Sequence, residues 1–306
     1  MATSFRLATY KSDQGPRAAL VLGDKVIDAA AATGNASDAS VMSLLTDWSA
    51  SLKRLDGAIE KGMASAKSLS SVTLLAPIPL PVAIYCAGAN YRDHANEMAR
   101  AQGKPEPVDP HELGLRSWHF IKIGHCVTGP GTTVKLPAKS KKVDWEVELA
   151  VIIGKTCRNA TEQNALDFVM GYTVANDLSA RDLGNRAGLP ENSNFRADWV
   201  SHKCFDGSCP MGPSITLARD IGNPHDLKLG LDVNGVKKQN SNTSELIFNI
   251  NEQIADISGR LTLHPGDIIL TGTPAGVGAG KGEFLKAGDK VRAWVDKIGD
   301  LDNTMA

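Results

Sequence analysis

The chain has 306 residues, of which 42% are hydrophobic and 22% charged, and its formal net charge at pH 7 is −1. These values are typical of a globular protein and exclude a disordered chain. They supply no overall positive field, so we expect neither nucleic acid nor a membrane surface as a partner. No apolar run approaches the roughly 20 residues that are needed to span a bilayer.

Five cysteines are scattered along the chain, at positions 86, 126, 157, 204 and 209. Their count is odd and their spacing matches no zinc motif, so we expect buried, reduced thiols. The N-terminal residues lack the apolar stretch of a signal peptide. These two features together favour a cytoplasmic protein.

Residues 1–75 are predicted to form a small N-terminal α+β domain. Residues 18–27 hold two short apolar runs around a Gly-Asp turn, which is typical of a hairpin. Over residues 41–59, apolar side chains recur at helical spacing, which predicts one helix that ends near Gly62. Residues 65–81 are rich in serine and then in proline, so we expect a linker there.

Residues 76–306 are predicted to form a second, catalytic domain. Apolar, β-branched runs separated by turns predict short strands, at residues 84–87, 133–136, 145–153, 171–176, 229–233, 268–270 and 291–295. An Asn-Gly pair predicts a hairpin turn at Asn234. We expect a threonine-capped helix over 161–171, another helix over 244–258, and a mobile loop over the polar residues 100–117. This mixture indicates an α+β, β-rich fold and not the regular βαβ alternation of a Rossmann sheet.

Three carboxylates lie within apolar, β-branched runs: Glu146, Glu148 and Asp177. A carboxylate in a buried strand is costly unless a positive group satisfies it. Residues two apart on a strand point to the same face, so Glu146 and Glu148 can reach one ion, and Asp177 can add a third ligand. Such a set suits Mg²⁺ or Mn²⁺ better than zinc. The alternative is an amphipathic strand with solvated glutamates.

His94 and Glu97 follow a strand and a glycine turn, where a short helix is expected to begin. At this spacing the two side chains share a helix face, so the carboxylate can orient the imidazole. Such a pair makes a general base that is able to activate water. The alternative is a surface helix whose histidine has no role.

Two basic residues, Lys203 and Arg181, and a turn within residues 266–278 complete the candidate site. Lys203 is expected to point into a pocket, where its charge could stabilise an oxyanion. Arg181 could bind a substrate carboxylate through a bidentate fork. For both cations the alternative is a solvated side chain. Residues 266–278 predict a strand and a Gly/Thr/Pro turn beside a ligand, but they lack the P-loop lysine and a G-x-G-x-x-G fingerprint, so we expect no dinucleotide.

Taken together, six segments resemble the fumarylacetoacetate hydrolase family, in the family's order. These segments are Gly88 to Glu97, Val143 to Gly154, Gly171 to Asp182, Lys203 to Pro213, Val233 to Gln239, and Gly266 to Gly278. The leading domain also resembles the small N-terminal domain of the longer members. The resemblance implies a mixed β-roll or sandwich catalytic domain, usually a homodimer, with Mg²⁺, Mn²⁺ or Ca²⁺ in its site.

The resemblance also assigns roles to individual residues. It implies Glu146, Glu148 and Asp177 as metal ligands, His94 and Glu97 as the water-activating pair, Lys203 as the active-site lysine, and Tyr91, Lys122, Arg181 and Thr273 as substrate-binding residues. Three features depart from the family pattern. Gly184 stands where members often have Gln, the stretch 184–199 is longer than in short members, and residues 123–125 replace a common proline. Substrate specificity therefore cannot be copied from a relative.

The expected activity is metal-dependent hydrolysis of a C–C bond in a 2,4-diketo acid, such as an acylpyruvate of the fumarylpyruvate or fumarylacetoacetate type, through a metal-stabilised enolate. His94 and Glu97 would activate the attacking water, and Lys203 would stabilise the oxyanion. The alternative on the same scaffold is decarboxylation or tautomerisation of an oxo-acid such as oxaloacetate, or hydrolysis of a diketo-deoxy sugar acid. A different hypothesis, a binding protein without catalysis, is disfavoured because every proposed reactive residue is present.

Overall fold

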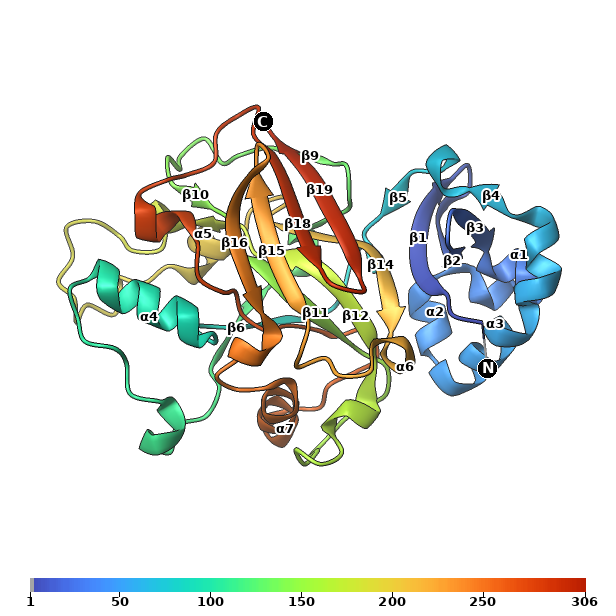
Figure 1. The fold of residues 1–306 in the computed structure, drawn as a ribbon, viewed down its shortest axis with the longest axis horizontal. Helices are drawn as coiled ribbons and strands as arrows, with labels where there is room; N and C mark the ends of the chain where they lie inside the picture. Colours follow the sequence, from blue (N-terminus) through green and yellow to red (C-terminus); the bar gives the residue numbers. More distant parts are fainter. Residues whose placement is uncertain (1–2) are drawn as a thin grey trace.

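A sheet of twelve strands runs through the molecule, and a sheet of five strands lies across part of it (Figure 1). The computed structural model describes residues 3–306. The large sheet has the order β4-β3-β2-β1-β14-β12-β11-β17-β6-β7, with β5 paired to β1 and β8 paired to β14. Its strands are β1 (Arg6–Ser12), β2 (Gly15–Leu22), β3 (Lys25–Asp28), β4 (Lys67–Ser68), β5 (Leu74–Leu75), β6 (Ile84–Ala87), β7 (His119–Lys122), β8 (Val127–Thr128), β11 (Val147–Ile153), β12 (Val169–Asn176), β14 (Cys209–Leu217) and β17 (Ile268–Leu270).

The smaller sheet has the order β16-β15-β18-β19-β9. Its strands are β9 (Thr133–Val134), β15 (Lys228–Val233), β16 (Val236–Asn242), β18 (Lys290–Val295) and β19 (Gly299–Met305), and a separate pair joins β10 (Val143–Asp144) to β13 (Ser179–Ala180). The α-helices are α1 (Ala29–Thr33), α2 (Val41–Leu45), α3 (Trp48–Gly62), α4 (Arg92–Ala101), α5 (Trp199–Lys203), α6 (Ala218–Ile221) and α7 (Ile250–Arg260). Within residues 3–306, no helix has the length and apolar character that a membrane crossing requires. The predicted α+β, β-rich class is confirmed.

The N-terminal domain combines the strands β1 to β5 with α1, α2 and α3. The predicted hairpin is confirmed, because β2 and β3 pair across the Gly-Asp turn, with Leu22 opposite Lys25. The single helix predicted over 41–59 is wrong: the backbone N–H of Ala50 donates to Asp47 Oδ1 at 3.1 Å, so a second helix starts there. The linker predicted over 65–81 holds β4 and β5, which pair with β3 and β1.

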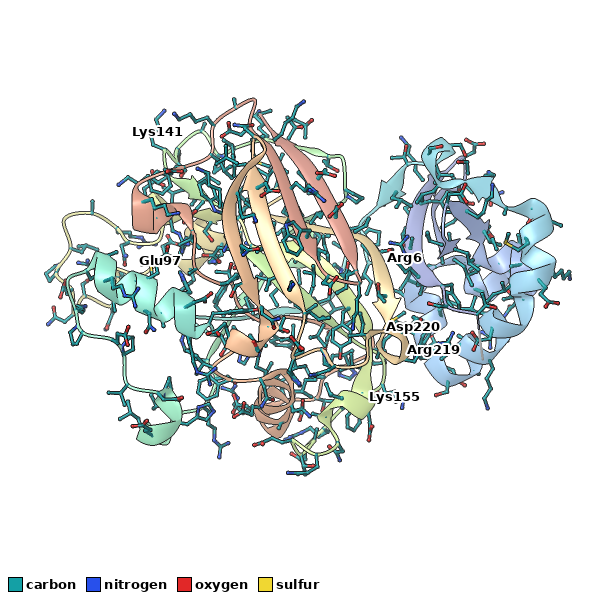
Figure 2. The ribbon with its side chains drawn as sticks, in the orientation of Figure 1. Arg6, Glu97, Lys141, Lys155, Arg219 and Asp220 are labelled. Atoms are coloured by element: carbon teal, nitrogen blue, oxygen red, sulfur yellow. The ribbon has the colours of Figure 1, made fainter. Side chains whose placement is uncertain are left out.

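The two parts of the chain share the large sheet through β14, which pairs with β1 on one side and with β12 on the other. The sequence analysis missed β14 because its prolines and glycine are typical of a loop. Figure 2 shows Arg6, Arg219 and Asp220 at this junction. Arg219 forms a forked ion pair with Asp56 of α3, with nitrogen to oxygen distances of 2.6 and 2.8 Å. The N-terminal domain is therefore fixed to the rest of the protein by backbone pairing and by charge.

Strand β11 separates two hydrophobic cores by the alternation of its side chains. Val147 and Leu149 pack with residues of the five-stranded sheet and of α7. Ala150 and Ile152 pack on the opposite face, in a core that includes the N-terminal domain. By the same alternation, Glu148 points away from the five-stranded sheet.

Two predicted helices differ from the structure. Over 161–171 there is only a 3-10 turn, Ala165–Phe168, because β12 already starts at Val169 to pair with β11. The helix predicted over 244–258 starts instead at Ile250, where Asn249 and Glu252 form a capping box. The segment expected to be a mobile loop contains the end of α4 and a short 3-10 helix, Pro110–Leu113.

Candidate metal centre and active site

Three buried carboxylates meet where β10, β11 and β12 come together. Each of Glu146, Glu148 and Asp177 offers one oxygen, and these oxygens lie within 4.8 Å of one another. The prediction that Glu146 sits on a strand is wrong, because it lies in the break between β10 and β11. Its backbone N–H donates to Asn176 Oδ1 at 2.9 Å, and its carbonyl accepts from the Asp177 N–H at 2.8 Å. The convergence that we predicted is therefore produced by the pairing of β11 with β12 and not by strand alternation alone.

Three cations surround these carboxylates. Lys203 Nζ donates to Glu146 Oε2 at 2.8 Å and to Asp177 Oδ2 at 2.6 Å. Lys122 Nζ lies 2.6 Å from Asp177 Oδ1 and donates to the Leu178 carbonyl at 3.1 Å. Arg181 pairs with Glu146. The alternative, that Lys203 and Arg181 are solvated cations, does not hold, since both belong to one buried charge network.

Glu148 is the carboxylate that these cations neutralise least. Among residues 3–306, its one hydrogen-bond donor is the backbone N–H of Gly272, at 2.5 Å from Oε2. Burial raises the pKa of Glu148 well above its usual value, and the negative charges of Asp177 and Glu146 raise it further. A divalent cation would remove this conflict, and carboxylate oxygens are the ligands that Mg²⁺, Mn²⁺ and Ca²⁺ prefer. The donor set therefore fits the divalent metal that we predicted.

His94 and Glu97 both project from α4, at the predicted spacing. The distance from His94 Nδ1 to Glu97 Oε2 is 3.7 Å, which is too long for a hydrogen bond. His94 Nδ1 is buried and has no hydrogen-bond partner among residues 3–306. Burial raises the pKa of Glu146, but Lys203, Arg181 and His94 together hold it below its usual value. His94 is therefore close enough to the acidic cluster to act electrostatically on it.

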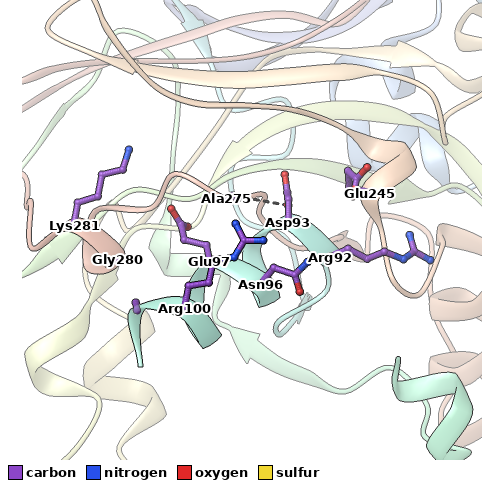
Figure 3. Close-up of a pocket in the computed structure, with 10 residues that line it drawn as sticks. Arg92, Asp93, Asn96, Glu97, Arg100, Glu245, Ala275, Gly280 and Lys281 are labelled. Carbon is purple, nitrogen blue, oxygen red and sulfur yellow. Dashed lines mark hydrogen bonds between the residues drawn. The ribbon is translucent and has the colours of Figure 1, made fainter. Parts of the chain in front are cut away.

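The turn after β17 is fastened to α4. The Gly276 N–H donates to Glu97 Oε2 at 2.9 Å, and the Ala275 N–H donates to Asp93 Oδ1 at 3.2 Å. Figure 3 shows the second of these bonds beside a cavity of about 740 Å³, which Glu97 and Lys281 also line. The turn that the sequence placed near a ligand thus holds the helix that carries His94.

Gln239 and Asp144 organise the site, although the sequence analysis gave neither of them a role. Gln239 Nε2 donates to Thr273 Oγ1 at 2.8 Å, and Gln239 Oε1 accepts from the Val147 N–H at 2.9 Å. Asp144 accepts from the backbone N–H groups of Gly278 and Ala279, at 2.6 and 3.0 Å, and from Arg181. A signal for Asp144 existed, because it is a third acid in the same apolar run as the two glutamates.

The remaining predicted residues lie deep in the protein. Tyr91 is fully buried at the start of α4, and its hydroxyl has no hydrogen-bond partner among the described residues. Thr273 is buried and is held by Gln239. Lys122 has no exposed side-chain surface. This burial favours a role for Lys122 in positioning Asp177.

Comparisons with known proteins give one consistent result. A sequence model of the family described as fumarylacetoacetate (FAA) hydrolase C-terminal matches residues 83–306. The chain is 37% identical over 312 residues to a protein of Xenopus laevis named as a mitochondrial oxaloacetate tautomerase, covering 99% of this chain and 90% of that protein. An oxaloacetate tautomerase of Rattus norvegicus is 40% identical over 236 residues, covering 76% of this chain and 69% of that protein. Among solved structures, a maleylpyruvate hydrolase of Sphingobium sp. SYK-6 in complex with manganese(II) and pyruvate has a TM-score of 0.74 and 33% identity, covering 98% of both chains.

Proposed function

Because this chain belongs to the fumarylacetoacetate hydrolase family, we propose that it interconverts the keto and enol forms of a small, anionic oxo-acid of the oxaloacetate type. The observation that carries the proposal is the match to an oxaloacetate tautomerase, which extends over 99% of this chain at 37% identity. This function is the alternative of the sequence analysis, and it takes precedence here over C–C hydrolysis. Tautomerisation and hydrolysis both pass through an enolate, so one site can support either.

The acidic cluster and its cations support an enolate. Glu146, Glu148 and Asp177 would hold a divalent cation, which when bound supplies Lewis-acid polarisation of the oxo group. The ammonium of Lys203 bridges Glu146 and Asp177 and carries a fixed positive charge at the same place. Burial lowers the pKa of Lys203, but Asp177 and Glu146 raise it more, so the side chain stays charged at neutral pH. A charge held in a low-dielectric site stabilises developing negative charge more strongly than it would in water.

Proton transfer is the whole chemistry of this reaction. Ketonisation breaks the enol O–H bond, shifts the double bond from C=C to C=O, and forms a C–H bond at the neighbouring carbon; one proton leaves the oxygen and one arrives at the carbon, so the composition of the substrate is unchanged. We propose that His94, whose Nδ1 faces Glu97, transfers the proton to and from the substrate carbon. Burial raises the pKa of Glu97, but His94 and the Gly276 N–H lower it more, so Glu97 is anionic at neutral pH. A shortening of the 3.7 Å separation to hydrogen-bond length would let this carboxylate orient the imidazole.

The direct test follows the ultraviolet absorbance of the conjugated enol of oxaloacetate after mixing with the protein and Mg²⁺ or Mn²⁺. We expect faster approach to the keto–enol equilibrium without release of CO₂, and loss of that acceleration in His94→Asn. Removal of the metal with EDTA should also abolish it. If the equilibrium is approached at the uncatalysed rate with Mg²⁺, Mn²⁺ and Ca²⁺ alike, the proposal is wrong.

C–C hydrolysis is the second candidate, because the maleylpyruvate hydrolase match covers 98% of both chains. His94 and Glu97 would then activate water instead of moving a proton at carbon. Product analysis separates the two functions, since maleylpyruvate would yield pyruvate and maleate in equal amounts. Pyruvate formation together with an unchanged enol signal from oxaloacetate would favour this candidate.

A further inference from the structure

Gly184 is a residue whose backbone does not require glycine. It follows the 3-10 turn Arg181–Leu183 with φ −73° and ψ −22°, a conformation that any residue adopts. A Cβ atom at this position would nevertheless come within 3.0 Å of His202 Nδ1 and 3.1 Å of His202 Cγ. The imidazole of His202 would therefore have to shift by a few tenths of an ångström to admit a side chain at 184.

His202 lies in helix α5, close enough to the acidic cluster for the charges of Glu146 and Asp177 to act on its pKa. It directly precedes Lys203, whose ammonium bonds to Glu146 and Asp177. Its ring lies 5.5 Å from the ring of Trp199, which in turn stacks on Phe120 at 5.1 Å. The packing of these rings fixes where the imidazole points.

One nitrogen of this imidazole is left without a partner. His202 Nε2 is buried and makes no hydrogen bond with any group of residues 3–306. A buried polar atom without a partner is costly, so such an atom beside the acidic cluster calls for an explanation. A bound ligand that supplies the missing hydrogen bond is such an explanation.

The charges around His202 indicate the kind of ligand. Burial, then Lys203, then Arg181 lower the pKa of His202 to about 4, against the opposing effect of the negative charges of Glu146 and Asp177. The imidazole is thus neutral at neutral pH, and it offers a hydrogen bond and not a charge. Beside two cations, the partner that suits it is an oxygen of an anionic ligand.

We propose that His202 binds the substrate through a hydrogen bond from Nε2 to an oxygen of the oxo-acid, and that Gly184 lets this imidazole keep its position. The inference deepens the proposed function, on which it rests for the class of ligand, but it holds for any reaction of an oxo-acid in this site. His202 then determines specificity together with residue 184, since a larger residue at 184 would displace it.

The binding test uses oxalate, a stable dicarboxylate that resembles the planar enolate, in the presence of Mg²⁺. The chain has seven histidines, so protein labelled with ¹⁵N at histidine gives few imidazole signals, and His202→Phe identifies the one from His202. We expect that signal to report a neutral ring and to shift when oxalate binds. A His202 signal that stays unchanged while oxalate saturates the protein would overturn the inference.

Matched variants separate hydrogen bonding from packing. His202→Phe keeps a ring against Trp199 but cannot bond, so calorimetry should show oxalate binding weakened about tenfold. His202→Gln can place an amide near the Nε2 position and should retain affinity within about threefold. His264 is exposed, and His264→Phe is the control that should bind as the unaltered protein does. Equal affinities of the His202→Phe variant and the unaltered protein would refute the assignment.

A double-mutant cycle tests the claim about Gly184. Gly184→Ala should weaken oxalate binding because the new Cβ pushes the imidazole aside, and it should have little further effect once His202→Ala is present. If the effects of the two changes on oxalate affinity are additive, a side chain at position 184 does not act through the position of the His202 imidazole. The result can also be told apart from that of the enol assay. If the His202 signal responds to oxalate but the protein does not act on oxaloacetate, the proposed tautomerase function is wrong and the assignment of His202 as a ligand-binding residue still holds.

Discussion

At the scale of single residues, the site holds several buried carboxylates, and the nearby cations neutralise some of these carboxylates more fully than others. Lys203 bonds to Glu146 and Asp177, and Lys122 lies against Asp177 as well. Within the part of the chain that the structure describes, Glu148 has only a backbone N–H, that of Gly272, as a hydrogen-bond donor. The protein thus keeps one carboxylate uncompensated, and this is the residue that most needs a metal.

Glu148→Gln should separate stability from metal binding. The amide keeps an oxygen for the Gly272 N–H but removes a buried charge that Asp177 and Glu146 oppose, so the metal-free variant should melt at a higher temperature than the unaltered protein. Mg²⁺ at about 100 times its dissociation constant should stabilise the unaltered protein by about 2.7 kcal/mol and the variant by almost nothing. Glu60 is exposed, so Glu60→Gln is the control in the same thermal scans. Equal Mg²⁺-dependent shifts would remove Glu148 from the metal site.

Lys203→Met should have the opposite effect on the metal-free protein. Removing one partner from a buried ion pair leaves uncompensated charge and typically costs about 3–5 kcal/mol. Chemical denaturation should show this loss, whereas Lys61→Met, at an exposed position, should change stability by less than about 0.5 kcal/mol. Saturating Mg²⁺ should restore part of the lost stability, because it supplies positive charge to the same carboxylates. A Lys203→Met protein as stable as the control would show that the network is not coupled as described.

At the scale of elements, the segment that follows α4 is held to the body of the protein by a histidine. His111, in the 3-10 helix Pro110–Leu113, lies between Asp109 and Glu252, with nitrogen to oxygen distances of 2.7 Å on both sides. Its ring also lies 4.5 Å from that of Phe248. Because α4 carries His94 and Glu97, this attachment limits how far the helix and its loop can move.

The attachment should weaken as pH rises. Glu252 and Asp109 raise the pKa of His111 above 6.5, so the protonated form is favoured in the folded state. Its stabilising contribution is complete below about pH 6.5, the unfolded value, and is lost as pH rises through the folded pKa. We expect hydrogen-exchange protection factors of residues 102–117, corrected for intrinsic rates, to fall over that range. His111→Gln should remove the dependence and His125→Gln should keep it; the same slope in both variants would contradict the attachment.

How far the sequence could predict these elements depended on whether local signals decided the structure. The Gly-Asp hairpin turn and the strands 84–87 and 268–270 follow from turn chemistry and β-branched runs, and they were predicted correctly. Strand β14 could not be predicted, because its prolines are tolerated only through its particular partners, β1 and β12. A local polar group can also interrupt a helix that the spacing of apolar residues predicts. The side chain of Asp47 caps the start of α3, so the apolar residues of 41–59 belong to two helices and not to one.

The site shows the same division. Glu146, Glu148 and Asp177 could be found because charge within an apolar run is unusual. His202 could not, since nothing in its sequence neighbourhood shows that an imidazole fills the space above Gly184. Gln239 was missed because its bonds to Thr273 and Val147 join residues that are far apart in the chain. Residue type thus locates the charged centre, and tertiary contacts decide which neutral groups surround it.

At the scale of the whole molecule, the fold expected from the family resemblance is confirmed, and one core joins its two parts. Phe5, Leu7 and Leu20 of the N-terminal domain pack in the same cluster as Ile152 and Ile215. The large sheet is continuous through β1 and β14. The domain boundary at residue 75, the homodimer and the cytoplasmic location stay predictions. The shared core bears on the predicted domain boundary at residue 75, because two segments that share a core can unfold as one unit even where the sequence suggests two domains.

The two parts should therefore unfold together. A domain that shares its core and a strand pair with its neighbour cannot lose structure without exposing apolar surface on both. Scanning calorimetry should show one transition that Mg²⁺ moves as a whole, although the metal ligands all lie after residue 145. Arg219→Met, which removes the ion pair with Asp56, should lower that transition slightly without splitting it, since a partly exposed pair contributes about 0–1 kcal/mol. A trace with two transitions, of which Mg²⁺ moves one, would show instead that the N-terminal domain is energetically independent of the metal centre.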